Sequence, residues 1–466
     1  MSGDSKLGSA ERALSPERLR LETTDVPVEA IKTYARNARR HTRKQVEQIA
    51  ESIRAFGFVS PLLIDEQGVI IAGHGRLAAA KKLGYSTVPV VRVEHLDDAQ
   101  KRALRIADNK LCELAGWDEE LLKLEFSDLL KIDLRLDLSF DLEITGFASA
   151  EIDRLVNDSA EDPDDDKSPE LPAQAPVTRP GDLWILGGHR LICGDALEEA
   201  TYEKLMGEDT AQMSISDPPY NVPIGGHVSR TGRHRAFAMA SGEMSEDEFT
   251  RFLQTYLTHA TKRCDPAAIH LTFIDWRHMR EMLNASRQAE LELKNLVVWD
   301  KGSGAMGSFY RSQHELAFIF KSPGASHKNN VQLGKFGRNR TNVWSYPGAH
   351  SLRKELELHP TPKPVALIAD AIRDVSDRNN LVLDCFAGSG TTIIAAEKVG
   401  RRCRAIELDP GYVDVAVKRW LLRTGETAIH ADTGLSFADR AKQMAGKPSR
   451  IRRRPTPFVL NAANGE

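Results

Sequence analysis

Ser216-Asp217-Pro218-Pro219-Tyr220 is the first of two stretches that decide the fold of this 466-residue chain, and Asp384-Cys385-Phe386-Ala387-Gly388-Ser389-Gly390-Thr391-Thr392 is the second. Each follows a short apolar run, residues 212–215 and residues 381–383, of the kind that forms a buried strand. In α/β proteins the loops at the carboxyl edge of the sheet bind ligands. We therefore expect a doubly wound α/β sheet with both loops at that edge.

The first stretch suits the activation of an exocyclic amino group on a nucleic-acid base. Such a nitrogen is a poor nucleophile because its lone pair is delocalised into the ring. Asp217 can accept one amino hydrogen and the carbonyl of Pro218 the other, and preorganised acceptors stabilise the developing positive charge. The two prolines, Pro218 and Pro219, add rigidity, and Tyr220 offers a face on which a flipped base can stack. A simple turn is the alternative, since Asp and Pro favour turns.

The second stretch is typical of a loop that binds a ligand through its backbone. Residues 386–391 follow a strand and open an apolar helix, where glycines let a ligand approach and helix amides face it. A dinucleotide-binding turn is the rival, but Ile393 stands where that motif has its third glycine. A further strand, residues 404–408, contains Glu407, which can accept the two ribose hydroxyls of an adenosyl cofactor. A solvated strand end is the alternative for Glu407.

With these motifs in this order, the sequence from residue 180 to about 425 resembles the β class of amino-group DNA methyltransferases, in which the catalytic motif precedes the cofactor loop. Cys193-Gly194-Asp195 resembles the family's motif for the adenine ring of S-adenosylmethionine. Residues 295–301 and 309–315 resemble its central motif, and residues 359–364 the stretch before the cofactor loop. The resemblance implies a Rossmann-like domain, residues 180–435, that transfers a methyl group from S-adenosylmethionine to double-stranded DNA.

The resemblance also implies the site residues. The catalytic motif is Asp217, Pro218, Pro219 and Tyr220. The cofactor would be held by Asp195, Lys363, Asp384, Phe386, Ala387, Gly388, Ser389, Gly390, Thr391 and Glu407, with Lys363 near the methionine end. In this family Asp at the head of the tetrapeptide is usual for N6-adenine enzymes, and Ser is usual for N4-cytosine enzymes. Because Asp217 aligns with the head, we expect adenine N6, and cytosine N4 is the alternative.

Local basic patches must supply the contacts to DNA, because the net charge of the chain is only −3. Residues 36–44, 328–354 and 440–454 form such patches, and each can equally be a solvated face. The family places target recognition at about residues 323–357, a region short enough to predict a short or relaxed target site. The predicted DNA contacts, to base edges or to phosphates, are Arg311, Arg338, Asn339, Arg340 and Asn342.

A smaller unit, residues 21–156, precedes the region of methyltransferase resemblance. It contains a predicted helix at residues 43–56, a hairpin, and the turn Gly73-His74-Gly75-Arg76 at the start of a second helix. Free helix amides and a guanidinium make such a turn an anion site. Residues 21–115 resemble the α+β ParB/sulfiredoxin fold, whose members use a comparable turn on nucleotides or phosphates. A nucleotide is therefore a candidate ligand. The alternatives are a turn that grips DNA phosphate, a nucleotide hydrolase and a nuclease.

The remaining segments connect or flank these units. Residues 157–179 are acidic and then rich in proline, which predicts an extended linker. We expect a disordered N-terminus over residues 1–20, a helical bridge over residues 97–156 and a basic tail over residues 436–466.

Composition excludes several classes. The five cysteines lack a C-x-x-C pair, so neither a metal site nor a disulfide frame is predicted. No apolar run approaches the ~18 residues of a membrane helix, and a signal-peptide core is missing. We expect a cytoplasmic protein without membrane contact. Its oligomeric state is open, with a homodimer as one option. By resemblance, such fusions belong to phage and prophage or restriction-modification systems. A binding protein with an inert catalytic domain is the remaining alternative.

Overall fold

The computed structural model describes residues 21–136, 142–156, 165–171, 175–222, 242–304, 309–331, 339–348 and 363–445. The chain forms two compact units, Met1–Asp158 and Ser159–Glu466. The predicted N-terminal segment 1–20, Arg338, residues 359–362 and the tail from residue 446 lie outside the described residues.

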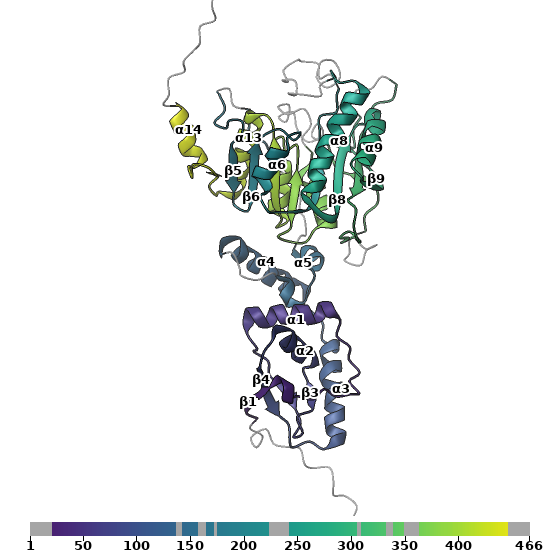
Figure 1. Ribbon diagram of the computed structural model, residues 1–466, viewed down its shortest axis with the longest axis vertical. Helices are drawn as coiled ribbons and strands as arrows, with labels where there is room; N and C mark the ends of the chain where they lie inside the picture. The colour runs from purple at the N-terminus through teal and green to yellow at the C-terminus, as the bar shows by residue number, and fades with distance from the viewer. Residues whose placement is uncertain are drawn as a thin grey trace, which may run out of the picture. The chain divides into compact units, whose positions relative to one another are not determined.

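The first unit contains the predicted α+β fold (Figure 1). Its described strands form one sheet in the order β1-β4-β2-β3, in which β2 is parallel to β4 and the other neighbours are antiparallel. The elements are β1 (Thr23–Pro27), η2 (Val28–Ala30), α1 (Arg43–Phe56), β2 (Leu62–Ile64), β3 (Ile70–Ala72), α2 (His74–Leu83), β4 (Thr87–Arg92), α3 (Asp98–Leu114), α4 (Glu119–Leu136), η3 (Leu142–Thr145) and α5 (Ser149–Val156).

Local signals in the sequence explain where these helices begin and end. The Thr42 side chain accepts a hydrogen bond from the Gln45 amide at the start of α1, and Gly57, with φ 80°, ends the helix. The sheet and α2 share a core that includes Leu62, Ile64 and Leu77. Helices α4 and α5 pack around a separate core, so residues beyond 118 form more than a bridge.

The second unit is built on a mixed sheet in the order β11-β9-β10-β8-β7-β12-β13-β6-β5-β14. Its elements are β5 (Leu183–Leu186), β6 (His189–Cys193), α6 (Glu199–Met206), β7 (Ala211–Ser216), α8 (Glu246–Lys262), β8 (Cys264–Ile274), η4 (Trp276–His278), α9 (Met279–Gln288), β9 (Glu292–Asp300), β10 (His314–Lys321), β11 (Val343–Ser345), α11 (Val365–Val375), β12 (Leu381–Asp384), α12 (Thr391–Lys398), β13 (Arg402–Glu407), α13 (Pro410–Thr424), β14 (Ile429–His430) and α14 (Phe437–Ala445).

Helices cover both faces of this sheet. Side chains from α11, α12 and α13 form one core with the sheet, and side chains from α6, α8 and α9 form the other. The five central strands, β8, β7, β12, β13 and β6, run parallel, and their neighbours β10 and β5 run antiparallel. The prediction of a doubly wound, Rossmann-like α/β fold is confirmed.

The position of the site follows from one strand pairing. Strands β7 and β12 are direct parallel neighbours, with Asp384 opposite Ile215 in the register. The chain leaves β7 toward β8 on one side and β12 toward β13 on the other, so this pair is the point where the strand order reverses. Ligands bind at such switch points in open α/β sheets. Both motifs therefore meet at one edge.

Two predicted boundaries need correction. Residues 165–171 and 175–179 of the predicted linker belong to the second unit, and Asp165 is buried there. The predicted basic tail begins with helix α14, whose Phe437 packs on Trp184 and whose Arg440 pairs with Asp182 at 2.5 Å. In both places the local composition suggested solvation, but distant partners bury these side chains. Among the described helices, none has the length and apolarity needed to span a membrane.

Candidate active site

The catalytic motif begins directly after β7, where Asp217 is bound through both carboxylate oxygens. The Tyr220 hydroxyl donates to its Oδ1 over 2.6 Å, and the Lys363 ammonium donates to its Oδ2 over 2.5 Å. Lys363 Nζ also lies 3.2 Å from the Tyr220 hydroxyl. The structure therefore brings two predicted catalytic side chains and one predicted cofactor side chain into a single cluster.

A second carboxylate, Glu315, completes this cluster and was not predicted as a site residue. It stands at the start of β10, and its Oε2 lies 3.0 Å from Lys363 Nζ and 3.1 Å from the Tyr220 hydroxyl. Its Oε1 pairs with Lys301. The signal in the sequence was its place at the end of the central motif, directly before an apolar strand. We name Asp217, Tyr220, Lys301, Glu315 and Lys363 the catalytic cluster.

Burial and charge oppose each other in this cluster. Burial acts to raise the pKa of Glu315, but Lys363 and Lys301 outweigh it and hold that pKa well below its usual range. Burial acts to lower the pKa of Lys363, and Asp217 and Glu315 outweigh it in turn, so the net shift is upward. Burial and the two carboxylates raise the pKa of Tyr220 far above its ordinary value. Lys363 is thus held as a cation and Tyr220 as a neutral donor.

Aromatic rings surround the ammonium of Lys363. Its Nζ lies 5.0 Å from the ring centroid of Phe273, 5.6 Å from that of Tyr220 and 5.7 Å from that of Trp299. Rings at these distances attract a cation through their quadrupoles. The structure therefore gives Lys363 a place beside Asp217 that the predicted contact with the methionine end did not anticipate.

The glycine loop lies beside this cluster, at the end of β12. Asp384 is buried, and its Oδ1 accepts from the Phe386 amide over 2.9 Å. Burial raises the pKa of Asp384 to about 6, although hydrogen bonds from Thr392 and the Phe386 amide act to lower it. Gly390 caps α12 with φ 82°, and a Cβ there would lie 2.8 Å from the Cβ of Ala416. Only glycine fits this turn without strain.

Glu407 ties the glycine loop to the next strand. Its Oε2 accepts from the Gly388 amide and its Oε1 from the Asp409 amide, each over 2.8 Å. Burial raises the pKa of Glu407 to about 7 in spite of these two hydrogen bonds. The Gly194 amide donates to the Glu407 carbonyl over 3.0 Å, so Asp195, the next residue, lies near Glu407.

These residues fit an adenosyl cofactor. Each carboxylate oxygen of Glu407 keeps a lone pair for a ribose hydroxyl. Asp195 follows the adjacent strand β6 and already fixes its own turn by accepting from the Leu197 amide over 2.9 Å. Ser389 and Thr391 lie at the start of α12, where free amides favour a polar ligand.

The predicted DNA contacts divide into two groups. Arg311, Asn339 and Asn342 are exposed. Arg340 pairs with Asp370 and with Asp374 at 2.9 Å each, which weighs against a contact with DNA. That contact stays a prediction.

An exposed aromatic pair was not predicted. Phe309 and Tyr310 are 86% and 81% exposed, and their ring centroids lie 4.5 Å apart. They precede Arg311 in the connection between β9 and β10.

In the first unit, the predicted anion turn stands at the start of α2. Gly73 caps the helix with φ 98°, and a Cβ on Gly75 would lie 2.9 Å from Ile49. His74 Nε2 is buried without a hydrogen-bond partner among the described residues. Burial is the largest cause that lowers the pKa of His74, and His41 and Arg105 add to it.

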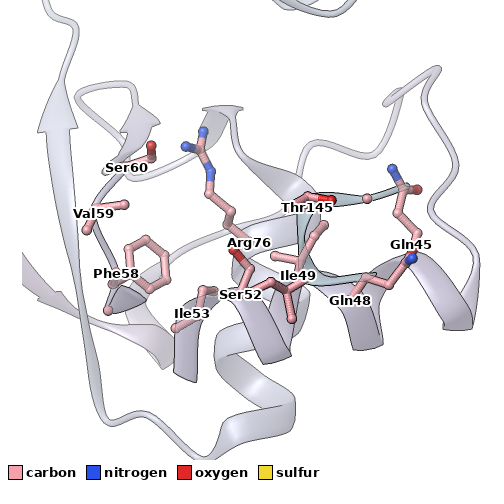
Figure 2. Close-up of a pocket in the computed structure, with 13 residues that line it drawn as sticks. Gln45, Gln48, Ile49, Ser52, Ile53, Phe58, Val59, Ser60, Arg76 and Thr145 are labelled. Atoms are coloured by element: carbon pink, nitrogen blue, oxygen red, sulfur yellow. The ribbon is translucent and has the colours of Figure 1, made fainter. Parts of the chain in front are cut away.

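Arg76 lines a pocket of about 400 Å³ beside this turn. Figure 2 shows its side chain extending into the space between Ser60 and Thr145. Burial lowers the pKa of Arg76, although Asp108 opposes this. The other lining residues are Gln45, Gln48, Ile49, Ser52, Ile53, Gly57, Phe58, Val59, Ile144 and Gly146.

Three family models match the chain. A DNA methylase model matches residues 211–418, a ParB N-terminal domain model matches residues 11–110, and a ParB-methyltransferase HTH domain model matches residues 120–180. The HTH match covers α4 and α5, which were predicted only as a helical bridge.

Individual relatives match the two parts of the chain separately. Over 76 residues the chain is 50% identical to the ParB-like nuclease domain-containing protein YnaK of Escherichia coli (strain K12). This match covers 16% of this chain and 87% of that protein. Over 260 residues it is 25% identical to the type II methyltransferase M.ScaI of Streptomyces caespitosus. This match covers 49% of this chain and 80% of that protein. The solved structure of PvuII DNA methyltransferase (cytosine-N4-specific) has a TM-score of 0.40 and 16% identity, covering 58% of this chain and 94% of that chain.

Proposed function

This chain is a DNA methylase of the N6/N4 amino-methyltransferase family with a ParB N-terminal domain, and from that premise we propose that it methylates N6 of adenine in double-stranded DNA. The observation that carries the choice of base is Asp217, which stands at the head of the Asp-Pro-Pro-Tyr motif and lies in the catalytic cluster. N4 of cytosine is the alternative target.

Asp217 and the carbonyl of Pro218 would orient the amino group. Each accepts one amino hydrogen, so the nitrogen lone pair turns out of the ring plane and toward the incoming methyl group. S-adenosylmethionine supplies that methyl group as a sulfonium electrophile. Positive charge then develops on the nitrogen, the Asp217 carboxylate stabilises it, and the nitrogen finally releases one of its hydrogens to solvent as a proton.

The other members of the catalytic cluster would hold Asp217 in place. Tyr220 and Lys363 each donate to one of its oxygens, which fixes the plane of the carboxylate. Glu315 lies within 3.0 Å of Lys363 and balances its charge, so the ammonium is not drawn wholly to Asp217. The ring of Tyr220 is also the predicted stacking surface for a base taken out of the duplex.

Transfer of label from S-adenosylmethionine to unmethylated double-stranded DNA tests this proposal, with the product digested to nucleosides. We expect label in N6-methyladenosine. Asp217→Ala should abolish transfer and retain cofactor binding, and Glu208→Ala, which changes an exposed carboxylate, should leave both unchanged. Label in N4-methylcytosine would keep the mechanism and overturn the base. Loss of cofactor binding in Asp217→Ala would show that its role is misassigned.

A second ligand is favoured by the pocket at Arg76. We infer that this pocket takes a phosphate-bearing ligand such as a nucleotide. The support is a guanidinium that has no hydrogen bond to another described residue and lines a pocket of about 400 Å³ next to a glycine-containing helix start. Nucleotide binding should survive Asp217→Ala and be lost in Arg76→Ala, with the exposed Arg43→Ala as control. Binding that survives Arg76→Ala would refute the assignment.

A further inference from the structure

The acidic pair Asp165-Asp166 binds three helices of the catalytic unit. Asp165 Oδ2 lies 2.5 Å from Lys398 Nζ on α12, and its Oδ1 lies 3.1 Å from the Arg423 guanidinium on α13. Asp166 Oδ1 accepts from the Val365 amide at the start of α11 over 2.8 Å. Only 5% of the Asp165 side chain is exposed. These two residues of an acidic run that predicts a solvated spacer are therefore bound to the catalytic fold.

Arg419 connects this acidic pair to the cofactor loop. One of its nitrogens donates to the Asp165 carbonyl over 2.8 Å. The other donates to the Thr391 hydroxyl over 3.1 Å and lies 3.3 Å from both the carbonyl and the hydroxyl of Ser389. Ser389 and Thr391 belong to the loop that opens α12. A single guanidinium thus bridges the acidic pair and the glycine turn.

The acidic pair stabilises the charge of Arg419. Burial lowers the pKa of Arg419 to about 10, and the two carboxylates that act to raise it are Asp166 and Asp165. A buried cation without its counter-charges relaxes toward solvent or reorganises its surroundings. The two carboxylates therefore favour the charged form of Arg419, which donates to the glycine turn.

Asp166 reaches the catalytic cluster by a second route. Helix α11 begins after Pro364, which offers no side-chain cap, so the Asp166 carboxylate caps the helix from 199 residues away in the sequence. Lys363 lies two residues before the capped amide and donates to Asp217. The cap fixes the backbone from which the Lys363 side chain extends.

We propose that Asp165 and Asp166 are positioning residues of the cofactor site, acting through Arg419 on the Ser389–Thr391 turn and through the start of α11 on Lys363. We call Asp165, Asp166 and Arg419 the acidic clasp. This proposal rests on the proposed function, because it assumes that the Ser389–Thr391 turn binds S-adenosylmethionine. Its residues Asp165 and Asp166 lie outside the DNA methylase match and inside the HTH match, which ends at residue 180. The stretch that joins the two parts therefore completes the cofactor site.

The test measures cofactor affinity in the full chain, by calorimetry with S-adenosylmethionine and with S-adenosylhomocysteine, well below the unfolding transition. The variant is Asp165→Ala/Asp166→Ala. Glu170→Ala is the matched control, because it removes a carboxylate from the same segment that is exposed and makes no described contact. Hydrogen bonds to charged groups predict that Kd and KM for S-adenosylmethionine rise about 10- to 100-fold in the double variant. KM for DNA should not change.

Several readouts separate positioning from a merely structural role. A structural role lowers the melting temperature alone, whereas positioning raises KM for the cofactor and spares KM for DNA. Asp165→Glu, which retains the charge, should recover most of the cofactor affinity. A folded double variant with wild-type Kd overturns the proposal, and so does an equal rise in both KM values. If the double variant does not fold, Asp165→Asn decides by the same criteria.

The failure of the proposed function would look different. Wild-type protein that binds S-adenosylmethionine but methylates no adenine contradicts the base assignment, and its cofactor affinity still tests the clasp. Wild-type methylation of adenine together with unchanged affinity in the folded double variant contradicts the clasp alone.

Discussion

Lys363→Met is the substitution that tests the catalytic cluster most directly. Asp217 and Glu315 face Lys363 and Lys301, so these four charges sum to zero. Methionine keeps the apolar stem between the rings of Phe273 and Trp299 and removes the ammonium, which leaves one negative charge in excess. Only 5% of the Lys363 side chain is exposed, so water cannot replace it. The cluster must then bind a proton to restore balance.

The size of the effect follows from the cost of breaking a buried ion pair. Removing one partner costs about 3–5 kcal/mol. Each pH unit corresponds to about 1.36 kcal/mol. The cost therefore shifts the acid limb of the activity profile, the pH range in which activity is lost on acidification, upward by about 2–4 pH units. The pKa of Glu315, which Lys363 and Lys301 hold low against burial, rises when Lys363 is lost. Starting from about 2, a rise of about 2–4 pH units brings this pKa to about 4–6, so activity should be lost in mildly acidic buffer and return toward neutral pH.

The assay is methyl transfer across the pH range, with KM for S-adenosylmethionine measured at each pH. Lys363→Arg is the control, since it keeps the charge and should keep the acid limb near that of the wild type. An unchanged acid limb together with a much higher KM for the cofactor would refute this reasoning. It would support the contact with the methionine end of the cofactor that the family resemblance implies.

Three further outcomes are expected. Burial raises the pKa of Glu407 to about 7, against 4.5 for the free group, so its contribution to stability is present below pH 4.5 and is lost as the pH rises through 7. The ligand-free protein should lose about 3 kcal/mol of unfolding free energy over this range. Denaturant titrations at pH 5 and pH 8 should show a smaller difference for Glu407→Gln. Arg340→Ala should lower the free energy of unfolding by about 1–3 kcal/mol, because Asp370 and Asp374 lose the partner that they share while Asp370 keeps Arg373 at 2.9 Å. A wild-type melting temperature with weaker DNA binding would support the predicted base contact. Tyr220→Phe keeps the stacking ring and removes the hydroxyl that donates to Asp217 over 2.6 Å. We expect kcat to fall about 10- to 100-fold with little change in KM for DNA. A fall in kcat matched by an equal rise in KM for DNA would point to stacking instead.

Local patterns in the sequence were sufficient for the fold. The apolar runs before Asp217 and Asp384 are strands β7 and β12, and the helix predicted at residues 43–56 has those bounds. Strand pairs of this kind bury both faces, so their sequences are apolar throughout and can be recognised without knowledge of their neighbours. The loops that follow them carry turn residues whose local geometry is equally characteristic.

Partners that are distant in the sequence were not predicted. Glu315 lies in a motif that was recognised, but nothing near it indicates that Lys363 and Tyr220 share its oxygens. Arg340 stands in a basic patch, and its counter-charges lie on α11, about thirty residues beyond. A charged side chain on its own predicts exposure, and only the tertiary fold shows which charges neutralise each other.

The acidic pair Asp165-Asp166 shows why composition misleads at the junction between the two units. Low hydrophobicity and a run of like charges predict a solvated chain, because such a segment cannot bury enough apolar surface to offset its loss of entropy. That rule does not consider the charges on the surface against which the segment lies. Lys398 lies on α12, which the sequence predicts as an apolar helix, and Arg419 and Arg423 lie on α13. All three bind Asp165, Arg419 through the main-chain carbonyl and the other two through the carboxylate. The segment is held because the catalytic unit presents three cations to Asp165, so the negative charge that suggested a spacer is the reason it binds.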